Sequence, residues 1–339
     1  MKFAKKIGAI AAAAAMLTAV TACSANNTSS DSAASGAADG KTYKIGITQM
    51  MDHPALNQSN EGFIAALADK GYVDGENITI SNQNGQGETA NLNTIATQFV
   101  GDEVDLIFAI ATPAAQAAQG QTTEIPIIGT AITDFAVAGL VNSNENPGTN
   151  VSGTTDMNPI KEQIDLLLKL APETKTVGFL YNSSEDNSVL QTDIAKAYLD
   201  EKGIAWTEKT VSSTNEVQQA TTSIASEVDA IYIPTDNIFA SSMSIVGEVA
   251  AQNKIPVITG ETGMAEGGGL ATLGINYYNL GYQAGLMAVR VLEGEDISTM
   301  PIEGSTEFEY YINGDTVEAL GITIPEDLQQ YVQTPGEAE

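Results

Sequence analysis

The chain has 339 residues, with 14 lysine and arginine against 43 aspartate and glutamate side chains, and its formal net charge is −29. This excess of negative charge argues against binding to nucleic acid and against electrostatic docking on anionic lipid, because both need basic side chains. The single cysteine, Cys23, leaves no disulfide framework, and the single histidine, His53, lacks the partners of a histidine-based metal site or a catalytic triad.

Residues 1–22 have the pattern of a secretory signal. Basic residues precede an apolar run, and Val20-Thr21-Ala22 places small residues before Cys23. A cysteine directly after such a cut resembles the signal of bacterial lipoproteins, which implies that Cys23 is lipidated and holds the protein on the outer face of the cell membrane. A plain secretory signal or a buried structural cysteine is the alternative. Residues 23–41, rich in small and polar residues, are expected to form a flexible linker.

After the linker, strand and helix patterns alternate along the chain. Apolar runs predict strands at residues 43–48, 77–81, 105–110 and 125–129. Helical spacing of apolar residues predicts helices at residues 57–70, 89–100 and 113–119. Continuous apolar strands separated by helices indicate a parallel sheet that is covered on both faces.

A second copy of this unit follows the first. Its strand patterns lie at residues 175–180, 227–232 and 255–260, and its first helix pattern lies at residues 187–201. Thr235 takes the place that Thr112 has in the first copy. The same order at a nearly constant offset indicates duplication of a whole α/β unit. We therefore predict two Rossmann-like lobes that present the carboxyl ends of their strands to a common ligand cleft.

The signal, the linker and the two lobes together resemble the substrate-binding proteins of ABC importers, which have the type I periplasmic-binding fold. One family of them, which includes tryptophan- and tyrosine-binding lipoproteins, is the nearest in pattern. The segments that carry this resemblance are residues 44–49, 53–57, 62–63, 111–116, 125–134, 181–188, 235–237 and 276–278.

The resemblance implies three crossings between the lobes. The N-terminal lobe is then expected to comprise residues 42–153 and 275–303, and the C-terminal lobe residues 154–274 and 304–335. The helix at residues 277–292 is expected on the first lobe, and residues 307–312 are expected to return to the second.

Loops after the strands supply the predicted ligand site. Thr112-Pro113-Ala114 opens a helix whose unpaired N–H groups could bind a carboxylate, and Ser183 and Ser184 precede another helix start. Both segments could instead be ordinary helix caps. Asp236 is a candidate partner for an ammonium group, and Glu261 is a weaker one; each could instead be a carboxylate that favours the helix dipole.

Aromatic side chains near the cleft loops could contact an apolar ligand side chain, although an aromatic residue is more often part of the core. His53 is a candidate ligand contact or a surface-loop residue. The complete set of predicted ligand-binding residues is Gln49, His53, Thr112, Pro113, Ala114, Thr130, Phe135, Tyr181, Ser183, Ser184, Asn187, Ser188, Thr235, Asp236, Asn237, Glu261, Asn276 and Tyr277.

The resemblance implies a monomeric, extracytoplasmic receptor that closes on a small ligand and delivers it to an ABC permease and its ATPase. The resemblance favours an amino acid, and an aromatic one. No cofactor is expected, because the G-x-G-x-x-A pattern at residues 85–90 follows the second strand rather than the first and serves as a turn. The alternatives are a ligand-sensing receptor for a signalling partner and an extracellular hydrolase. The sequence contains no nucleophile elbow that would support the hydrolase.

Overall fold

The chain is described here as a computed structural model that covers residues 41–334. The predicted signal at residues 1–22, the lipidation of Cys23 and the linker up to residue 40 lie outside the described residues. Among those that are described, no helix is both long enough and apolar enough to cross a membrane.

The strands form two separate sheets. The first sheet, in the order β11-β5-β4-β3-β1-β2, is parallel throughout. Its strands are β1 (Tyr43–Gln49), β2 (Ile78–Asn84), β3 (Leu106–Ile110), β4 (Ile127–Ile132), β5 (Val151–Thr155) and β11 (Glu303–Gly304). The second sheet has the order β13-β12-β10-β9-β8-β6-β7. Its strands are β6 (Thr176–Asn182), β7 (Ala205–Val211), β8 (Ala230–Ile233), β9 (Val257–Thr259), β10 (Ala271–Gly274), β12 (Glu309–Asn313) and β13 (Val332–Gln333).

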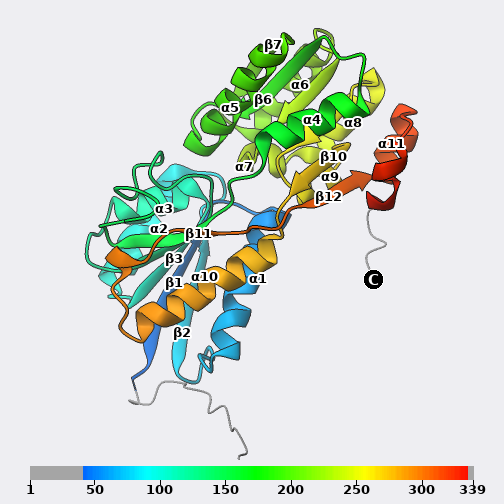
Figure 1. Cartoon of the computed structure of the whole chain (residues 1–339). Coiled ribbons are helices and arrows are strands. Elements are labelled where there is room, and N and C mark those ends of the chain that lie inside the picture. Colours follow the sequence, from blue (N-terminus) through cyan, green and yellow to red (C-terminus); the bar gives the residue numbers. More distant parts are fainter. Residues whose placement is uncertain (1–40, 335–339) are drawn as a thin grey trace, which may run out of the picture. The chain divides into compact units, whose positions relative to one another are not determined.

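Helices alternate with the strands in both lobes (Figure 1). The helices of the first lobe are α1 (Pro54–Asp69), α2 (Thr89–Gly101), α3 (Thr112–Gln119), α10 (Tyr277–Leu292) and the 3₁₀ helix η2 (Ile297–Thr299). Those of the second lobe are α4 (Ile160–Leu170), α5 (Asp186–Lys202), η1 (Thr214–Glu216), α6 (Val217–Ala225), α7 (Asn237–Ala240), α8 (Met243–Asn253), α9 (Thr262–Glu266), α11 (Gly314–Leu320) and η3 (Glu326–Tyr331).

This architecture confirms the predicted class of two α/β lobes with mainly parallel sheets, the type I periplasmic-binding fold. One pair departs from the parallel arrangement, because β12 runs antiparallel to β10 in the second sheet. The chain passes between the sheets after β5, before α10 and after β11.

Strands buried on both faces supply the core of each lobe. In the first lobe, the rings of Phe63 and Phe108 stack with their centroids 3.7 Å apart. In the second, Phe179 and Tyr232 meet edge to face with centroids 5.9 Å apart. These aromatic contacts join the central strands to each other or to a covering helix, and they add to the free energy that comes from burying apolar area.

Helices α1 and α10 lie side by side on the first lobe and approach each other unusually closely (Figure 1). A Cβ atom added at Gly281 would lie 1.9 Å from the backbone oxygen of Ser59, and one added at Gly62 would lie 2.0 Å from the backbone oxygen of Tyr278. Only glycine permits this approach. The close packing fixes the N-termini of both helices relative to each other, and both N-termini reach the cavity described next.

Candidate functional site

A small cavity lies where loops at the carboxyl ends of strands from both lobes come together. Its volume is about 20 Å³, which is room for about one water molecule. The lining residues from the first lobe and the first crossing are His53, Ala55, Leu56, Ala131, Asp156 and Tyr277. Those from the second lobe are Asn187, Thr235, Asp236, Asn237, Ala240 and Glu261. A ligand of amino-acid size therefore enters only when the lobes move apart.

The N-terminus of α1 presents backbone donors to this cavity. His53 precedes the helix, and in the described part of the chain its side chain makes no capping hydrogen bond. Pro54 has no N–H group, and among the described residues no group accepts a hydrogen bond from the buried N–H groups of Ala55 and Leu56. Unpaired N–H groups at the start of a 16-residue helix favour a bound carboxylate.

On the second lobe, by contrast, carboxylates of the chain itself occupy the helix starts. Asp236 caps α7 by accepting a hydrogen bond from the Phe239 N–H at 3.0 Å, and it also accepts from the backbone N–H of Asn182 and the hydroxyl of Ser188. Glu261 caps α9 by accepting from the N–H groups of Gly263 and Met264 at 2.6 and 3.0 Å. These two carboxylates therefore stabilise the starts of α7 and α9, and this role does not depend on a ligand.

A hydrogen-bonded chain of side chains joins the second lobe to the first. Glu185 accepts from the Asn237 side-chain nitrogen at 2.5 Å, and the Oδ1 atom of Asn237 lies 3.1 Å from Nε2 of His53. All three side chains are buried. Burial lowers the pKa of His53 to about 4, so that its imidazole is neutral at pH 7.

Asp156 is a functional candidate that the sequence interpretation missed. It follows β5 at the first crossing, and its carboxylate accepts hydrogen bonds from the Tyr277 hydroxyl at 2.8 Å and the Thr133 hydroxyl at 3.2 Å. The other site residues were predicted from their position directly after a strand, and Asp156 has that position after β5. The strand itself was not predicted, because Val151–Thr155 contains serine, glycine and threonine and gives no apolar signal.

The cavity is rich in carboxylates. Burial raises the pKa of Asp156 and of Asp236, and it raises the pKa of Glu261 to about 7. Neighbouring Glu185 also has a raised pKa, mainly through burial and also through repulsion by Asp236. None of the described residues that line the cavity is a lysine or an arginine. A cationic group that entered the cavity would lower the energy of the ionised carboxylates, so the arrangement favours a ligand with a positive charge.

Seven of the predicted residues line this cavity, whereas the other predicted residues lie outside it. The seven are His53, Asn187, Thr235, Asp236, Asn237, Glu261 and Tyr277. Pro113 and Ser184 instead line an outer hollow of about 500 Å³ between the same lobes. Ser183 is exposed, and Asn276 caps α10 by accepting from the Asn279 N–H.

Most of the remaining predicted residues are bonded or buried within one lobe. The hydroxyl of Thr130 bonds to that of Thr154 inside the first lobe, and the Gln49 side chain donates to Asn57. Ser188 donates to Asp236. Thr112 and Ala114 are buried at the start of α3.

Two aromatic residues do not lie where the sequence interpretation placed them. Phe135 is fully buried, and its ring packs over Gly129 of β4 in the first lobe. Tyr181 lies on the same face of β6 as Phe179, because side chains alternate along a strand, and its hydroxyl donates to Glu208 on β7. Of the three predicted aromatic residues, only Tyr277 lines the cavity.

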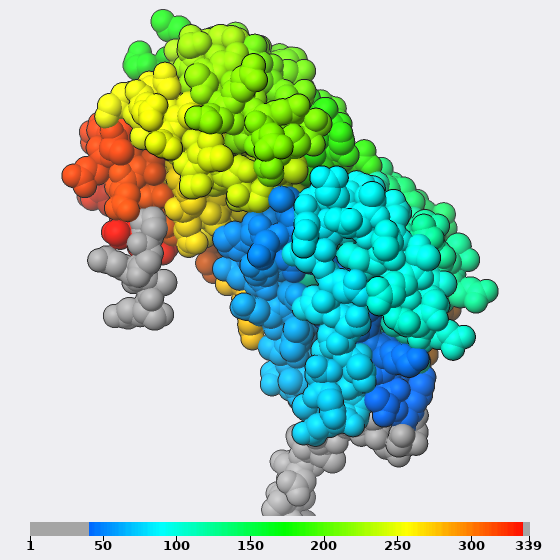
Figure 2. Space-filling model, turned by 180° about the vertical axis from the view of Figure 1, so that it is seen from behind, coloured from blue at the N-terminus to red at the C-terminus, as the bar shows by residue number. Residues whose placement is uncertain are grey.

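Further contacts hold the two lobes together around the cavity. The Gln191 side chain donates to the Thr133 hydroxyl at 3.0 Å. A Cβ atom added at Gly263 of α9 would lie 2.9 Å from Cβ of Pro54 at the start of α1. In Figure 2, the blue segment at the start of α1 lies against the yellow segment that includes α9. The lobes are thus closed on each other in this structure.

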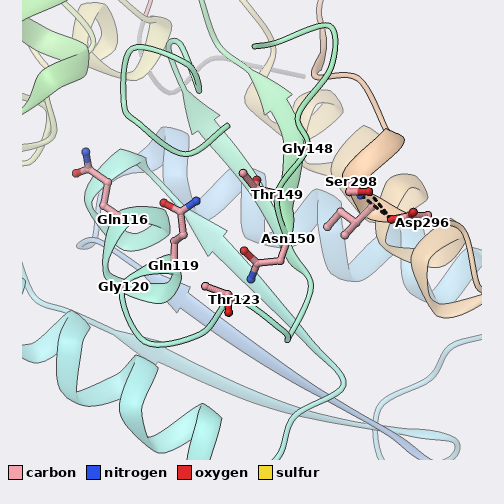
Figure 3. Close-up of a pocket in the computed structure, with 10 residues that line it drawn as sticks. Gln116, Gln119, Gly120, Thr123, Gly148, Thr149, Asn150, Asp296 and Ser298 are labelled. Carbon is pink, nitrogen blue, oxygen red and sulfur yellow. Dashed lines mark hydrogen bonds between the residues drawn. The ribbon is translucent and has the colours of Figure 1, made fainter. Parts of the chain in front are cut away.

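A larger hollow, of about 770 Å³, shares no lining residue with this cavity. Figure 3 shows the residues that line it. It is lined by side chains at the C-terminal end of α3, by residues before β5, and by η2, including Gln119, Asn150 and Asp296. The Gln119 and Asn150 amides already donate to backbone carbonyls. It lies at the amino ends of the strands, whereas ligands of open α/β sheets bind at the carboxyl ends.

The two lobes and the polar cavity between them define a solute-binding protein of the periplasmic type. A family model described as "ABC transporter substrate binding protein" matches residues 44–334. The chain belongs to this family of ABC transporter substrate-binding proteins. Proteins of the family work outside the cytoplasm, and the relatives described below are binding proteins rather than enzymes.

Relatives and solved structures resemble the chain over most of its length. It is 45% identical over 300 residues to a tyrosine-binding protein from Clostridioides difficile (strain R20291), covering 88% of this chain and 87% of the relative. An ABC domain from Streptococcus pneumonia in complex with L-Trp is 38% identical, with a TM-score of 0.84, covering 86% of this chain and 100% of that one.

A third structure shows which conformation the present one resembles. The ligand-free, open structure of a substrate-binding protein with adhesive properties from Clostridium difficile is 46% identical, covering 86% of this chain and 99% of that one. Its TM-score is nevertheless only 0.67. The present structure therefore matches the L-Trp complex better than the open form, in agreement with the contacts between its lobes.

Proposed function

We propose that this protein binds an α-amino acid with an aromatic side chain between its lobes and delivers it to an ABC permease. The observation that carries the proposal is the pairing of two features in one cavity. The start of α1 offers backbone donors suited to a carboxylate, and the surrounding carboxylates offer acceptors suited to an ammonium group. An α-amino acid carries both groups, the ammonium and the carboxylate, on its α-carbon.

Support for an aromatic side chain comes from the relatives. One is named for tyrosine, and another was solved with L-Trp. Tyr277 is the aromatic residue of the cavity in the closed structure, and it can contact a ligand ring. The closed cavity itself is far smaller than such a ring, so that ligand binding requires a hinge motion of the lobes.

The direct test is a native mass spectrum of protein purified from cells grown in rich medium. Retention of a mass equal to tyrosine, tryptophan or phenylalanine would support the proposal. Retention of a sugar or a polyamine in place of an amino acid would overturn the ligand assignment and leave membership of the family untouched.

We further propose that the protein acts as a monomer and that Cys23, once lipidated, anchors it to the membrane. The support is the sequence Val20-Thr21-Ala22-Cys23 after a basic and apolar start. In the variant Cys23→Ala, the protein should be released or remain unprocessed. Equal membrane retention of the variant and the wild type after washing would contradict the anchor.

A further inference from the structure

His53 faces both the ligand cavity and the opposite lobe. It is the only histidine of the chain, and 7% of its surface is exposed. Its Nε2 atom lies 3.1 Å from Oδ1 of Asn237 on the second lobe. Its other ring nitrogen, Nδ1, is buried and has no hydrogen-bond partner within residues 41–334.

The hydrogen-bond network determines which ring nitrogen carries the proton. The Asn237 side-chain nitrogen donates to Glu185, so the amide oxygen of Asn237 is the atom that faces His53. An amide oxygen can only accept, and Nε2 of His53 must therefore donate. The imidazole is neutral because burial lowers its pKa to about 4, which leaves a lone pair on Nδ1.

A second unpartnered acceptor lines the same cavity from the second lobe. The side-chain nitrogen of Asn187 donates to the Thr235 carbonyl oxygen at 2.9 Å and to Glu185 at 3.2 Å. This orientation leaves Oδ1 of Asn187 buried, with no donor among the residues that the structure describes. Each buried acceptor without a partner destabilises the closed form, and the cavity therefore has two acceptors, one from each lobe, that require donors.

We propose that the ammonium group of the ligand donates to Nδ1 of His53 and to Oδ1 of Asn187 together. This inference rests on the proposed function, in which the ligand is an α-amino acid. An ammonium group has three N–H donors and can satisfy both acceptors, whereas a phenol hydroxyl or an indole N–H has only one. Asp236 is less suited to this role, because its oxygens already accept three hydrogen bonds from the chain.

The arrangement couples recognition to closure. Asn237 holds the proton on Nε2 of His53 only when the lobes are together, and only that tautomer offers Nδ1 as an acceptor. A protonated imidazole would instead present an N–H group to the ammonium and repel it. His53 is thus a positioning residue for closure and a direct contact for the ligand.

One histidine allows a spectroscopic test without any mutation. Protein labelled with ¹⁵N-histidine gives a single pair of ring nitrogen resonances, observed at pH 7 with and without saturating L-tyrosine. We expect Nε2 to be protonated in the complex, and we expect L-tyrosine to move the Nδ1 resonance toward that of a hydrogen-bonded acceptor. An Nδ1 resonance that is protonated, or that stays unchanged at saturation, would overturn the inference.

Ligand analogues separate this inference from the proposed function. The analogue 3-(4-hydroxyphenyl)propionate has the ring, hydroxyl and carboxylate of L-tyrosine but no ammonium group. We expect it to bind at least about tenfold more weakly to the wild type and to leave Nδ1 unshifted. Binding of both compounds with equal affinity would overturn the inference, whereas failure of every aromatic amino acid to bind would overturn the proposed function itself.

A pair of variants tests the acceptor directly. His53→Phe removes the Nδ1 acceptor, whereas His53→Asn keeps an amide oxygen near its position. We expect His53→Phe to lose affinity for L-tyrosine but little for the analogue, and we expect His53→Asn to recover part of the loss. A variant that weakened both compounds equally would indicate a purely structural role. Melting temperatures of both variants show whether each is folded.

Discussion

The side chains of His53 and Asn237 form a hydrogen bond of 3.1 Å that joins the first lobe to the second beside the ligand cavity. This bond can form only when the lobes are closed, and Glu185 orients the Asn237 amide for it. The lobes therefore meet through a few polar contacts and one tight approach of α1 to α9. Binding and closure should be sensitive to single substitutions at these points.

Gly263→Ala should oppose closure. Its new Cβ atom would lie 2.9 Å from Cβ of Pro54, and the proline ring cannot rotate away. The lobes must then separate slightly, so we expect weaker binding of L-tyrosine by calorimetry and a larger radius of gyration in small-angle scattering. Gly101→Ala is the matched control, because no atom of the described residues lies within 4 Å of a Cβ at that position. Unchanged affinity and unchanged scattering in Gly263→Ala would contradict the closed arrangement.

Gly281→Ala should destabilise the first lobe. The added Cβ would lie 1.9 Å from the backbone oxygen of Ser59, and relief requires α1 and α10 to move apart. Overpacking of this kind costs about 1–3 kcal/mol, although alanine is otherwise the better helix former. Urea unfolding should show a lower midpoint for Gly281→Ala, whereas the midpoint of Gly101→Ala should stay the same or rise. An unchanged midpoint would show that the helices are not packed as closely as described.

Asp156→Asn should separate binding from stability. The amide keeps the size of the carboxylate and can still bond to Tyr277 and Thr133, but it removes a negative charge from the cavity. The ammonium group keeps a third N–H donor besides those proposed for His53 and Asn187, and Asp156 lines the same cavity. A hydrogen bond to a charged group contributes about 1.5–3 kcal/mol, so we expect affinity for L-tyrosine to fall by about tenfold or more. Thermal stability should not fall, because burial disfavours the charged carboxylate that the substitution removes. Loss of stability with unchanged affinity would assign Asp156 a structural role only.

The stability of the ligand-free protein should depend on the protonation of Glu261. Burial raises the pKa of Glu261 from 4.5 to about 7, so the folded state holds this proton more tightly than the unfolded state does. The stabilisation is fully present below about pH 4.5 and is lost as pH rises toward about 7. We expect the urea midpoint of the wild type to fall between pH 5 and pH 8 by more than that of Glu261→Gln.

The exposed residue Glu307 provides the control for this comparison. The variant Glu307→Gln should keep the pH dependence of the wild type. If Glu261→Gln also kept it, the buried carboxyl would not be the source.

The fold could be predicted largely because the duplicated strands are continuous apolar runs. Strand β7 (Ala205–Val211) gave no such signal, because it is an edge strand whose residues are mostly exposed and include the charged pair Glu208 and Lys209. Strand β5 is buried, but its serine, glycine and threonine residues give no apolar signal, so it was missed, and Asp156 was missed with it. The amino-acid composition of such a segment does not identify it as a strand, because the segment is buried by the neighbouring strands of the sheet and not by its own apolar side chains.

The site could be predicted only in part, because position after a strand does not fix the direction of a side chain. Asp236, Asn237 and Glu261 lie at helix starts that the strand-end rule locates. Tyr181 also lies at the end of a strand in the sequence, but side chains alternate between the two faces of β6, and its ring points away from the cavity. The N–H groups at the start of α1 are free because the His53 side chain does not cap them. The direction of that side chain does not follow from its position in the sequence.

The most direct test of the account is a calorimetric titration of the mature protein, first freed of bound ligand, with L-tyrosine, L-tryptophan, L-phenylalanine, L-alanine and glucose at pH 7. We predict one ligand per chain, with saturable binding of at least one aromatic amino acid, weaker binding of alanine and no heat with glucose. Saturable binding of glucose without binding of any amino acid would contradict the central claim.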